Sequence, residues 1–185
     1  MTTTSPSTVT ETPTNRAFVV RPAQPADAAA LRELRIDALA RHPEAFAADL
    51  DAAVAEPPAT WEALIADNAA ADKGVICVAE TAAGLVGMAG LVRGRWPKTW
   101  SSGTIWGVYV RPDWRGLGVG AALLDACADW GRAHGMTIIK LAVVTTNAAA
   151  IRSYARCGFT VYGVEPQVMR VDGVDYDELL MAREL

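Results

Sequence analysis

The stretch that decides the fold reads Ile105-Trp106-Gly107-Val108-Tyr109-Val110-Arg111-Pro112-Asp113-Trp114-Arg115-Gly116-Leu117-Gly118-Val119-Gly120-Ala121. Its first part is rich in β-branched and aromatic residues, which favour a strand, and proline cannot continue a sheet ladder beyond Arg111. After the glycines, apolar residues recur at helical spacing up to about His134. The order is therefore strand, glycine turn and helix, and it places several backbone N–H groups at a helix start.

This turn has the properties of a phosphate site. The first N–H groups of a helix have no internal partner and the helix dipole adds partial positive charge there, so a pyrophosphate satisfies both. The glycines at 116, 118 and 120 remove the side chains that would hold phosphates away. Arg115 adds a fixed charge and a forked hydrogen-bond donor. We predict a diphosphate-binding turn between Arg115 and Ala121.

Two other interpretations of the glycines stay open. One is that the glycines serve only a tight connection between strand and helix. Gly116-x-Gly118-x-x-Ala121 also satisfies the dinucleotide fingerprint in form, but that motif needs its turn directly after the strand and an acidic residue about 20 positions later. Neither condition is met, and no Gly-Lys-Ser or Gly-Lys-Thr is present to make a P-loop.

The rest of the chain shows alternating strand and helix patterns without an internal repeat. Apolar periodicity, capping residues and turn signals give the boundaries. The expected elements are a strand at 17–21, helices at 25–40 and 57–68, a hairpin of strands at 75–80 and 85–92, a strand at 137–144, a helix from 147 to 157, and final strands at 160–169 and 176–185.

Length and composition predict one globular domain. The 185 residues are 51% hydrophobic, but charges interrupt every apolar stretch before it reaches the ~18 residues of a membrane span. Residues 1–16 lack the basic start and apolar run of a secretory signal, so we expect a disordered tail there and a domain at 17–185. A cytoplasmic location follows by default, and we expect no membrane contact.

Charge and cysteine content disfavour further classes of protein. A net charge of -4 disfavours a dedicated nucleic-acid binder, which is normally basic. The three cysteines form no C-x-x-C pair and have no His-rich neighbourhood, so we expect neither a disulfide scaffold nor a metal site.

A second block, Asn147-Ala148-Ala149-Ala150-Ile151-Arg152-Ser153-Tyr154 with Cys157-Gly158-Phe159 behind it, completes the pattern. The glycine turn matches Q/R-x-x-G-x-G/A and this block matches N-x-x-A-x-x-x-Y-x-x-x-G-F, so the chain resembles the GNAT superfamily of N-acetyltransferases. Together with the predicted elements, the resemblance implies an α/β (α+β) fold with a mixed central sheet of about six to seven strands and about four flanking helices. It implies acetyl-CoA as the co-substrate.

The resemblance also assigns roles to residues. The strand before the turn would splay from its neighbour at a bulge, with Gly107 as its marker, and the pantetheine arm would pair with Val108 and Val110. A backbone N–H at Val108 or Tyr109 would stabilise the thioester oxyanion. The implied acetyl-CoA-binding residues are Val108, Tyr109, Val110, Arg115, Gly116, Leu117, Gly118, Val119, Gly120, Ala121 and Asn147.

Tyr154 is the implied general acid. A phenol with a pKa near ~10 is protonated at neutral pH and suits a thiolate leaving group. Asn147 and Tyr154 are nearly two helical turns apart, which puts both on one side of the helix. A core tyrosine whose hydroxyl is bonded to backbone is the alternative.

The base and the acceptor are less determined by the sequence. Many relatives use a glutamate on the strand before the turn, but residues 104–109 contain no carboxylate, which leaves a water chain or a more distant acid such as Glu44. We expect Glu44 to be an ordinary loop acid and His42 to be a surface residue. The resemblance frames the acceptor with the first helices and the last strand pair, and Trp96, Trp100 and Trp106 could line an apolar pocket.

Transfer of an acetyl group to a primary amine of a small-molecule acceptor is the function that these features favour. A protein N-terminal or lysine acetyltransferase and a non-catalytic acyl-CoA sensor are the alternatives. An oxidoreductase using the same glycines is disfavoured by the absent acidic residue. The C-terminal edge strands leave a homodimer open.

Overall fold

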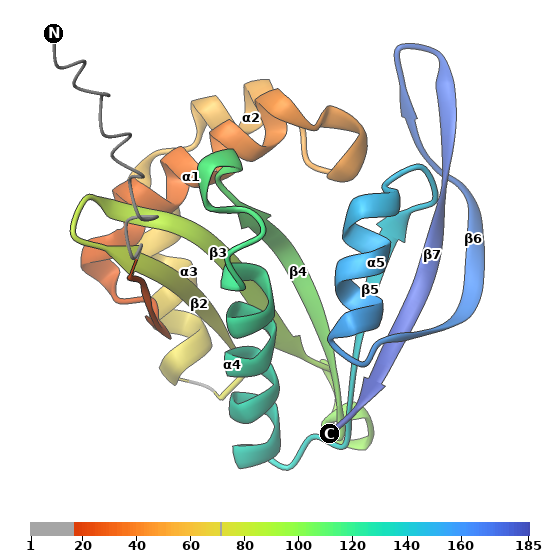
Figure 1. The fold of residues 1–185 in the computed structure, drawn as a ribbon. Helices are drawn as coiled ribbons and strands as arrows, with labels where there is room; N and C mark the ends of the chain where they lie inside the picture. Colours follow the sequence, from red (N-terminus) through yellow and green to blue (C-terminus); the bar gives the residue numbers. More distant parts are fainter. Residues whose placement is uncertain (1–16, 71) are drawn as a thin grey trace, which may run out of the picture.

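The computed structural model describes residues 17–70 and 72–185, so the predicted tail at 1–16 lies outside the described residues (Figure 1). The strands are β1 (Val19–Pro22), β2 (Gly74–Thr81), β3 (Gly84–Arg93), β4 (Ser102–Val110), β5 (Ile138–Val144), β6 (Thr160–Val171) and β7 (Val174–Glu184). The helices are α1 (Ala28–Arg41), α2 (Leu50–Ala55), α3 (Pro58–Ala70), α4 (Val119–Ala133) and α5 (Ala148–Arg156). Short 3-10 turns are η1 (Pro25–Asp27), η2 (Pro43–Ala45), η3 (Pro97–Thr99) and η4 (Pro112–Trp114).

All seven described strands form one sheet in the order β1-β2-β3-β4-β5-β7-β6. β4 and β5 are parallel and every other neighbouring pair is antiparallel, so the sheet is mixed. This confirms the α/β class that the sequence predicts. The parallel pair lies in the middle of the sheet, where helix α4 makes the crossover between its two strands.

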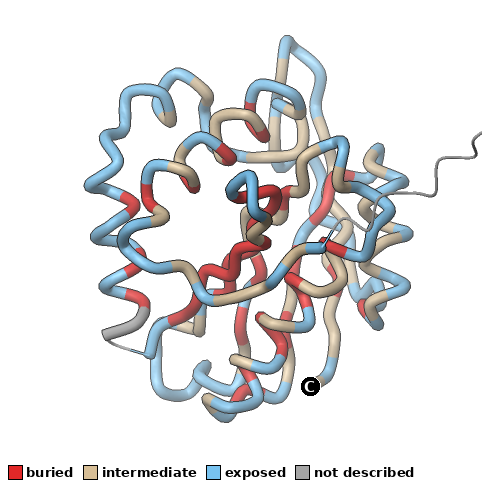
Figure 2. Tube along the Cα trace, turned by 60° about the vertical axis from the view of Figure 1, so that its left-hand side comes forward, coloured by how far each residue is buried: buried red, intermediate tan, exposed pale blue. Residues whose placement is uncertain are grey.

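Helices cover both faces of the sheet (Figure 1). Alternate residues of β2 point to opposite faces, so Cys77 packs in the core beneath α4 while Val78 packs in the core beneath α1 and α3. Leu123 of α4 and Leu31 of α1 are fully buried in these two cores. In Figure 2 the buried residues follow the strands and the helix sides that face them. The site therefore rests on a sheet that is fixed from both sides. No helix in the described part of the chain is both long and apolar enough to cross a bilayer.

Helix α2 is absent from the sequence prediction. It has only six residues and no buried side chain, so no apolar stripe indicates it. Its signal is the cap: the Asp49 side chain accepts a hydrogen bond from the Ala52 N–H at 3.0 Å. Arg32 of α1 donates to the carbonyl of Glu56 at 2.6 Å, just beyond the last helical turn. The bond from Arg32 fixes the end of α2 against α1.

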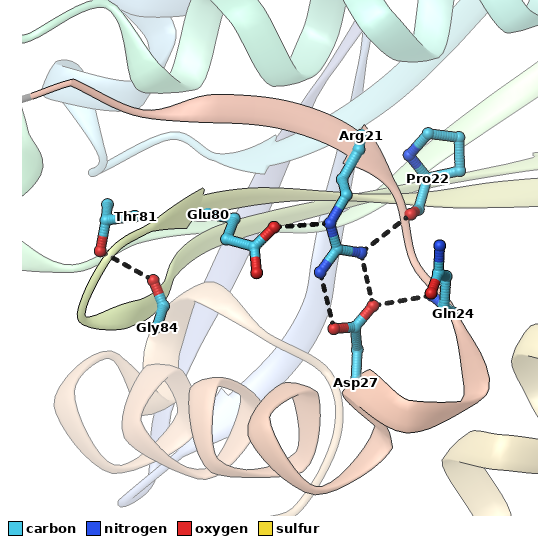
Figure 3. A network of polar contacts seen from close by, with 7 residues as sticks. All are labelled: Arg21, Pro22, Gln24, Asp27, Glu80, Thr81 and Gly84. Atoms are coloured by element: carbon cyan, nitrogen blue, oxygen red, sulfur yellow. Dashed lines mark hydrogen bonds and ion pairs between the residues drawn. The ribbon is translucent and has the colours of Figure 1, made fainter.

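A charged network fixes the entry to α1 (Figure 3). The Arg21 guanidinium donates to both carboxylate oxygens of Asp27, at 2.7 and 2.9 Å, and its Nε donates to Glu80 at 2.7 Å. The bonds from Arg21 hold the pKa of the Asp27 carboxyl below its ordinary value. This network links β1, η1 and β2, so it orients the first turn of α1.

Candidate functional site

The two parallel strands in the centre of the sheet separate after a short pairing. β4 and β5 pair only from Ser102 opposite Ile138 to Thr104 opposite Lys140. On the other side of β4, Met88 pairs with Tyr109 and Gly90 with Trp106, so two β4 residues oppose one residue of β3. This is a β-bulge, and a bulge bends its strand. The strand opening and the bulge predicted from the sequence are therefore both present.

Gly107 is the residue that makes the bulge conformation accessible. Its φ of +63° lies in the left-handed region, which side chains other than glycine rarely adopt. The neighbouring Trp106 is accommodated differently, by Gly90 on β3: a Cβ at Gly90 would lie 2.2 Å from the Trp106 ring. Gly107 therefore serves the bulge, and Gly90 makes room for the Trp106 ring.

A cavity of about 820 Å³ lies in the opening between β4 and β5. Its walls combine the outer half of β4, the end of β5, the glycine turn, the inner side of α5 and the η2 segment. The lining residues on which the argument below depends are His42, Glu44, Phe46, Trp106, Gly107, Val108, Tyr109, Val110, Arg115, Gly116, Gly118, Val119, Gly120, Ala121, Asn147 and Tyr154. All the site residues predicted from the sequence except Leu117 are on this surface. The Leu117 side chain is exposed.

The glycine turn presents free N–H groups at one end of the cavity. Gly116 and Gly118 have φ of +77° and +83°, and α4 begins at Val119. In the described chain, residues 115–118 form a turn, the N–H groups of residues 116–121 make no short hydrogen bond to another residue, and the first helical bond runs from Ala122 to Gly118 at 3.0 Å. Weakly bonded N–H groups in sequence at a helix start form an anion-binding arrangement.

The Arg115 side chain turns along the cavity wall. Its Nε donates to the carbonyl of Val110 at 3.0 Å, and its Nη2 lies 3.0 Å from Nε2 of His42. A guanidinium only donates, so Nε2 of His42 accepts and the ring proton resides on Nδ1. Nδ1 lies 4.0 Å from the Glu44 carboxylate. Arg115 thereby joins the end of β4 to the loop after α1.

Tyr154 reaches the cavity from α5 with an unbonded hydroxyl. The ring packs edge-on against Phe159, with the ring centroids 6.1 Å apart. No hydrogen bond of the Tyr154 hydroxyl to another described residue is present, unlike the backbone-bonded core tyrosine of the alternative interpretation. Burial, with a smaller contribution from Cys157, raises the pKa of Tyr154 to about 12. The phenol therefore stays protonated across the neutral range.

Asn147 and Tyr109 contact the cavity while their side chains are engaged elsewhere. The Asn147 Oδ1 accepts from the Ala150 N–H at 3.1 Å and caps α5, as its position before the helix predicts. The Tyr109 hydroxyl donates to Asp37 at 2.6 Å, and burial together with that bond raises the pKa of Tyr109 to about 12. Both residues therefore hold elements in place beside the cavity.

The acceptor side differs from expectation in two respects. His42 and Glu44, expected to be ordinary surface groups, line the cavity. Trp96 and Trp100 do not: they are 63% and 47% exposed, next to η3, and only Trp106 of the three tryptophans contributes to the wall. The three tryptophans are close in sequence, but Trp106 lies on β4, whereas the other two lie in the loop around η3.

Comparisons with known proteins agree with this geometry. Residues 32–159 match the model of the acetyltransferase (GNAT) family. A segment of 61 residues is 44% identical to the L-methionine sulfoximine/L-methionine sulfone acetyltransferase of Pseudomonas aeruginosa, and covers 33% of this chain and 36% of that relative. Another, of 62 residues, is 39% identical to streptothricin acetyltransferase of Streptomyces lavendulae, over 34% of this chain and 33% of that relative. The matched segments thus span about a third of these curated relatives.

Solved structures show the same fold over most of the chain. A GNAT-family acetyltransferase from Streptococcus pneumoniae superposes with a TM-score of 0.82 at 22% identity, over 91% of this chain and 100% of that one. A putative acetyltransferase from Salmonella typhimurium, determined with its cofactor acetyl-CoA, has a TM-score of 0.80 at 27% identity, over 91% and 94% of the two chains. Because the family model covers more than half of the residues, from α1 through Phe159, the chain belongs to the acetyltransferase (GNAT) family.

Proposed function

We propose that this chain transfers the acetyl group of acetyl-CoA to a primary amine of a small-molecule acceptor, by direct attack in a ternary complex. The observation that carries the proposal is the cavity itself. One end presents the free N–H groups of the glycine turn, and Tyr154 presents an unbonded hydroxyl to the same space. A diphosphate at the turn and a thioester beside the bulge would use both. The proposed setting is the cytoplasm, where acetyl-CoA is available.

Each chemical step can be assigned to a group of the chain. The acceptor nitrogen attacks the thioester carbon, and the backbone N–H of Val108 or Tyr109 stabilises the negative charge that develops on the oxygen. As the C–S bond breaks, the leaving thiolate takes the proton of the Tyr154 hydroxyl. Val108 and Val110 offer the backbone groups along which the pantetheine arm would lie.

The proton of the attacking amine needs a separate acceptor. Among the described cavity residues, Glu44 and His42 are the carboxylate and imidazole side chains, the residue types that most often act as general bases. The Nε2 of His42 is occupied by Arg115, so Glu44 is our candidate for the base, directly or through water. Glu44 would then take the role of the base, for which β4 offers no glutamate.

The direct test measures thiol release from acetyl-CoA with a broad panel of amines. We expect release with some of the amines, and a fall of at least tenfold in kcat/KM for Arg115→Glu, because the reversed charge lies beside the diphosphate and breaks the bond to Val110. Arg132→Glu is the matched control, since Arg132 is an exposed arginine near the far end of α4 that pairs with Asp129. Equal release by wild type and Arg115→Glu would reject the site. Coenzyme binding without release on any amine would favour the sensor.

We further propose a homodimer through β6. This strand lies at the edge of the sheet and exposes Val161, Tyr162 and Val164, which are more than half accessible. A long edge strand with exposed apolar residues is a template for pairing with another chain. We expect sedimentation velocity to show a dimer for the wild type and a monomer for Val164→Glu. A monomeric wild type at micromolar concentration would reject this interface.

A further inference from the structure

Arg35 of α1 is a half-buried cation that the fold leaves without a partner. Among the described residues, its guanidinium makes no hydrogen bond and no ion pair. It lies over the Phe46 ring, with its central carbon 4.8 Å from the ring centroid. Burial lowers the pKa of Arg35, and the charge of Glu56 offsets this only in part. Arg21, by contrast, is bound by two carboxylates.

A partly buried guanidinium without hydrogen-bond partners lowers the stability of the fold unless a ligand binds to it. Removing a guanidinium from water without hydrogen-bond partners opposes folding, which is why buried charges in proteins are normally paired. The Phe46 face supplies a cation–π contact but accepts none of the five N–H donors. Arg35 therefore has its full hydrogen-bonding capacity available for an anion.

The Arg35 guanidinium lies next to the bulge, where the proposed function puts the thioester. Arg35 Nη1 lies 4.0 Å from the point where a Cβ of Gly107 would be, so the guanidinium faces the bulge. Phe46 and Gly107 both line the large cavity. Arg35 itself lines a second cavity of about 470 Å³ between α1, α2 and α3, which shares Trp106 with the first. Arg35 thus lies between the cavity that would hold the thioester and the smaller cavity.

The short distance between the bulge and the Arg35 guanidinium limits which acceptor molecules fit the site. An amine that attacks a carbonyl beside residues 107–109 would have its own substituents within a few ångströms of Arg35. In an α-amino acid, the amine nitrogen and the carboxylate carbon are only about 2.5 Å apart. A carboxylate so placed can accept two parallel N–H bonds from one guanidinium.

We propose that Arg35 binds the carboxylate of an α-amino acid acceptor and holds its amine at the bulge. The side chain of the acceptor extends toward the pocket lined by Trp61, Leu64 and Trp106. Arg35 is then a specificity-determining residue for the reaction, and this assignment rests on the proposed transfer to a small-molecule amine.

The test compares matched acceptors: L-methionine, L-methioninamide and the decarboxylated amine 3-(methylthio)propylamine, together with the corresponding L-phenylalanine and L-leucine series. We expect wild-type kcat/KM to be at least tenfold higher for the amino acid in at least one series. In Arg35→Gln this ratio should fall by about 10- to 100-fold, as expected for loss of a charged hydrogen-bonded pair. Arg35→Lys should restore part of the ratio, and Arg132→Gln should keep it.

Two results would overturn the proposal: a wild type that prefers the amide or the amine in every series, or an Arg35→Gln ratio equal to that of wild type. Circular dichroism and coenzyme A-induced thermal stabilisation show whether Arg35→Gln has folded, and Arg35→Lys serves if it has not.

A binding measurement tests the Arg35 site independently of the proposed acetyl transfer. If no acceptor supports thiol release, the transferase fails, and thermal stabilisation of the coenzyme A-loaded chain decides the Arg35 site. Stabilisation by the amino acid, but not by its amide, that is lost in Arg35→Gln supports the site, and its absence in wild type rejects it.

Discussion

Gly118→Val should lose the thermal stabilisation that coenzyme A gives the wild type. At a ligand concentration 100 times Kd, binding contributes about 2.7 kcal/mol, which for a chain of this length raises Tm by roughly 5–10 °C. A Cβ at Gly118 meets no protein atom within 4 Å and so would project from the turn into open space. In the proposed complex that space holds the diphosphate. We therefore expect a shift below about 1 °C in differential scanning fluorimetry.

The variant also carries a backbone cost, which a matched control measures. A branched residue at φ of +83° is strained by about 1–3 kcal/mol or more, so the Tm of the unliganded variant will fall. Gly135 has φ of +76°, also with no atom within 4 Å of its Cβ position, and lies beyond the other end of α4. Gly135→Val should lose similar stability yet keep the coenzyme A shift. A shift retained in Gly118→Val would contradict the diphosphate site.

Tyr154→Phe should reduce kcat by about 10²- to 10⁴-fold with little change in coenzyme A affinity. The substitution removes only a hydroxyl that bonds to no described residue, and the ring contact with Phe159 remains. Stability should therefore be retained. Stopped-flow and steady-state thiol release measure the rate, and calorimetry measures coenzyme affinity. Tyr176→Phe, on β7 and outside the cavity lining, is the matched control and should retain full activity.

The pH dependence gives a second check on the same residue. A general acid acts in its protonated form, and burial raises the pKa of Tyr154 to about 12. The acid is thus present at all pH values up to about 11, so the wild-type rate should not decline between pH 7 and 10 because of this group. Undiminished turnover in Tyr154→Phe would reject the acid role.

The sequence predicts the fold well where signals are local. The strand, glycine turn and helix around Gly118 are found as expected, because a proline, three glycines and a helical apolar stripe all act within a few residues. The opening of the sheet after Thr104 was available only through the resemblance, since strand pairing is a long-range property. Helix α2 was missed because a six-residue exposed helix has no periodic signal.

The parts of the candidate site that the sequence did not predict are long-range contacts. Nothing near Arg115 in the chain indicates that its guanidinium meets His42, 73 positions away. That Arg35 makes no hydrogen bond or ion pair with another described residue is likewise visible only when its neighbours in the fold are known. Trp96 and Trp100 were grouped with Trp106 by adjacency, which carries no information about the direction in which a strand takes each residue.

The brief contact between β4 and β5 has a consequence for the integrity of the whole domain. Only three pairs of residues join the four-stranded N-terminal part of the sheet to the three-stranded C-terminal part, so the sheet has a seam along its middle. A molecule bound along that seam touches both parts and adds to their cohesion in proportion to its affinity. The core beneath α4 also spans this seam, because it packs Leu91 and Leu123 against Ile139 and Met181, so a bound ligand would reinforce a connection that side-chain packing already makes.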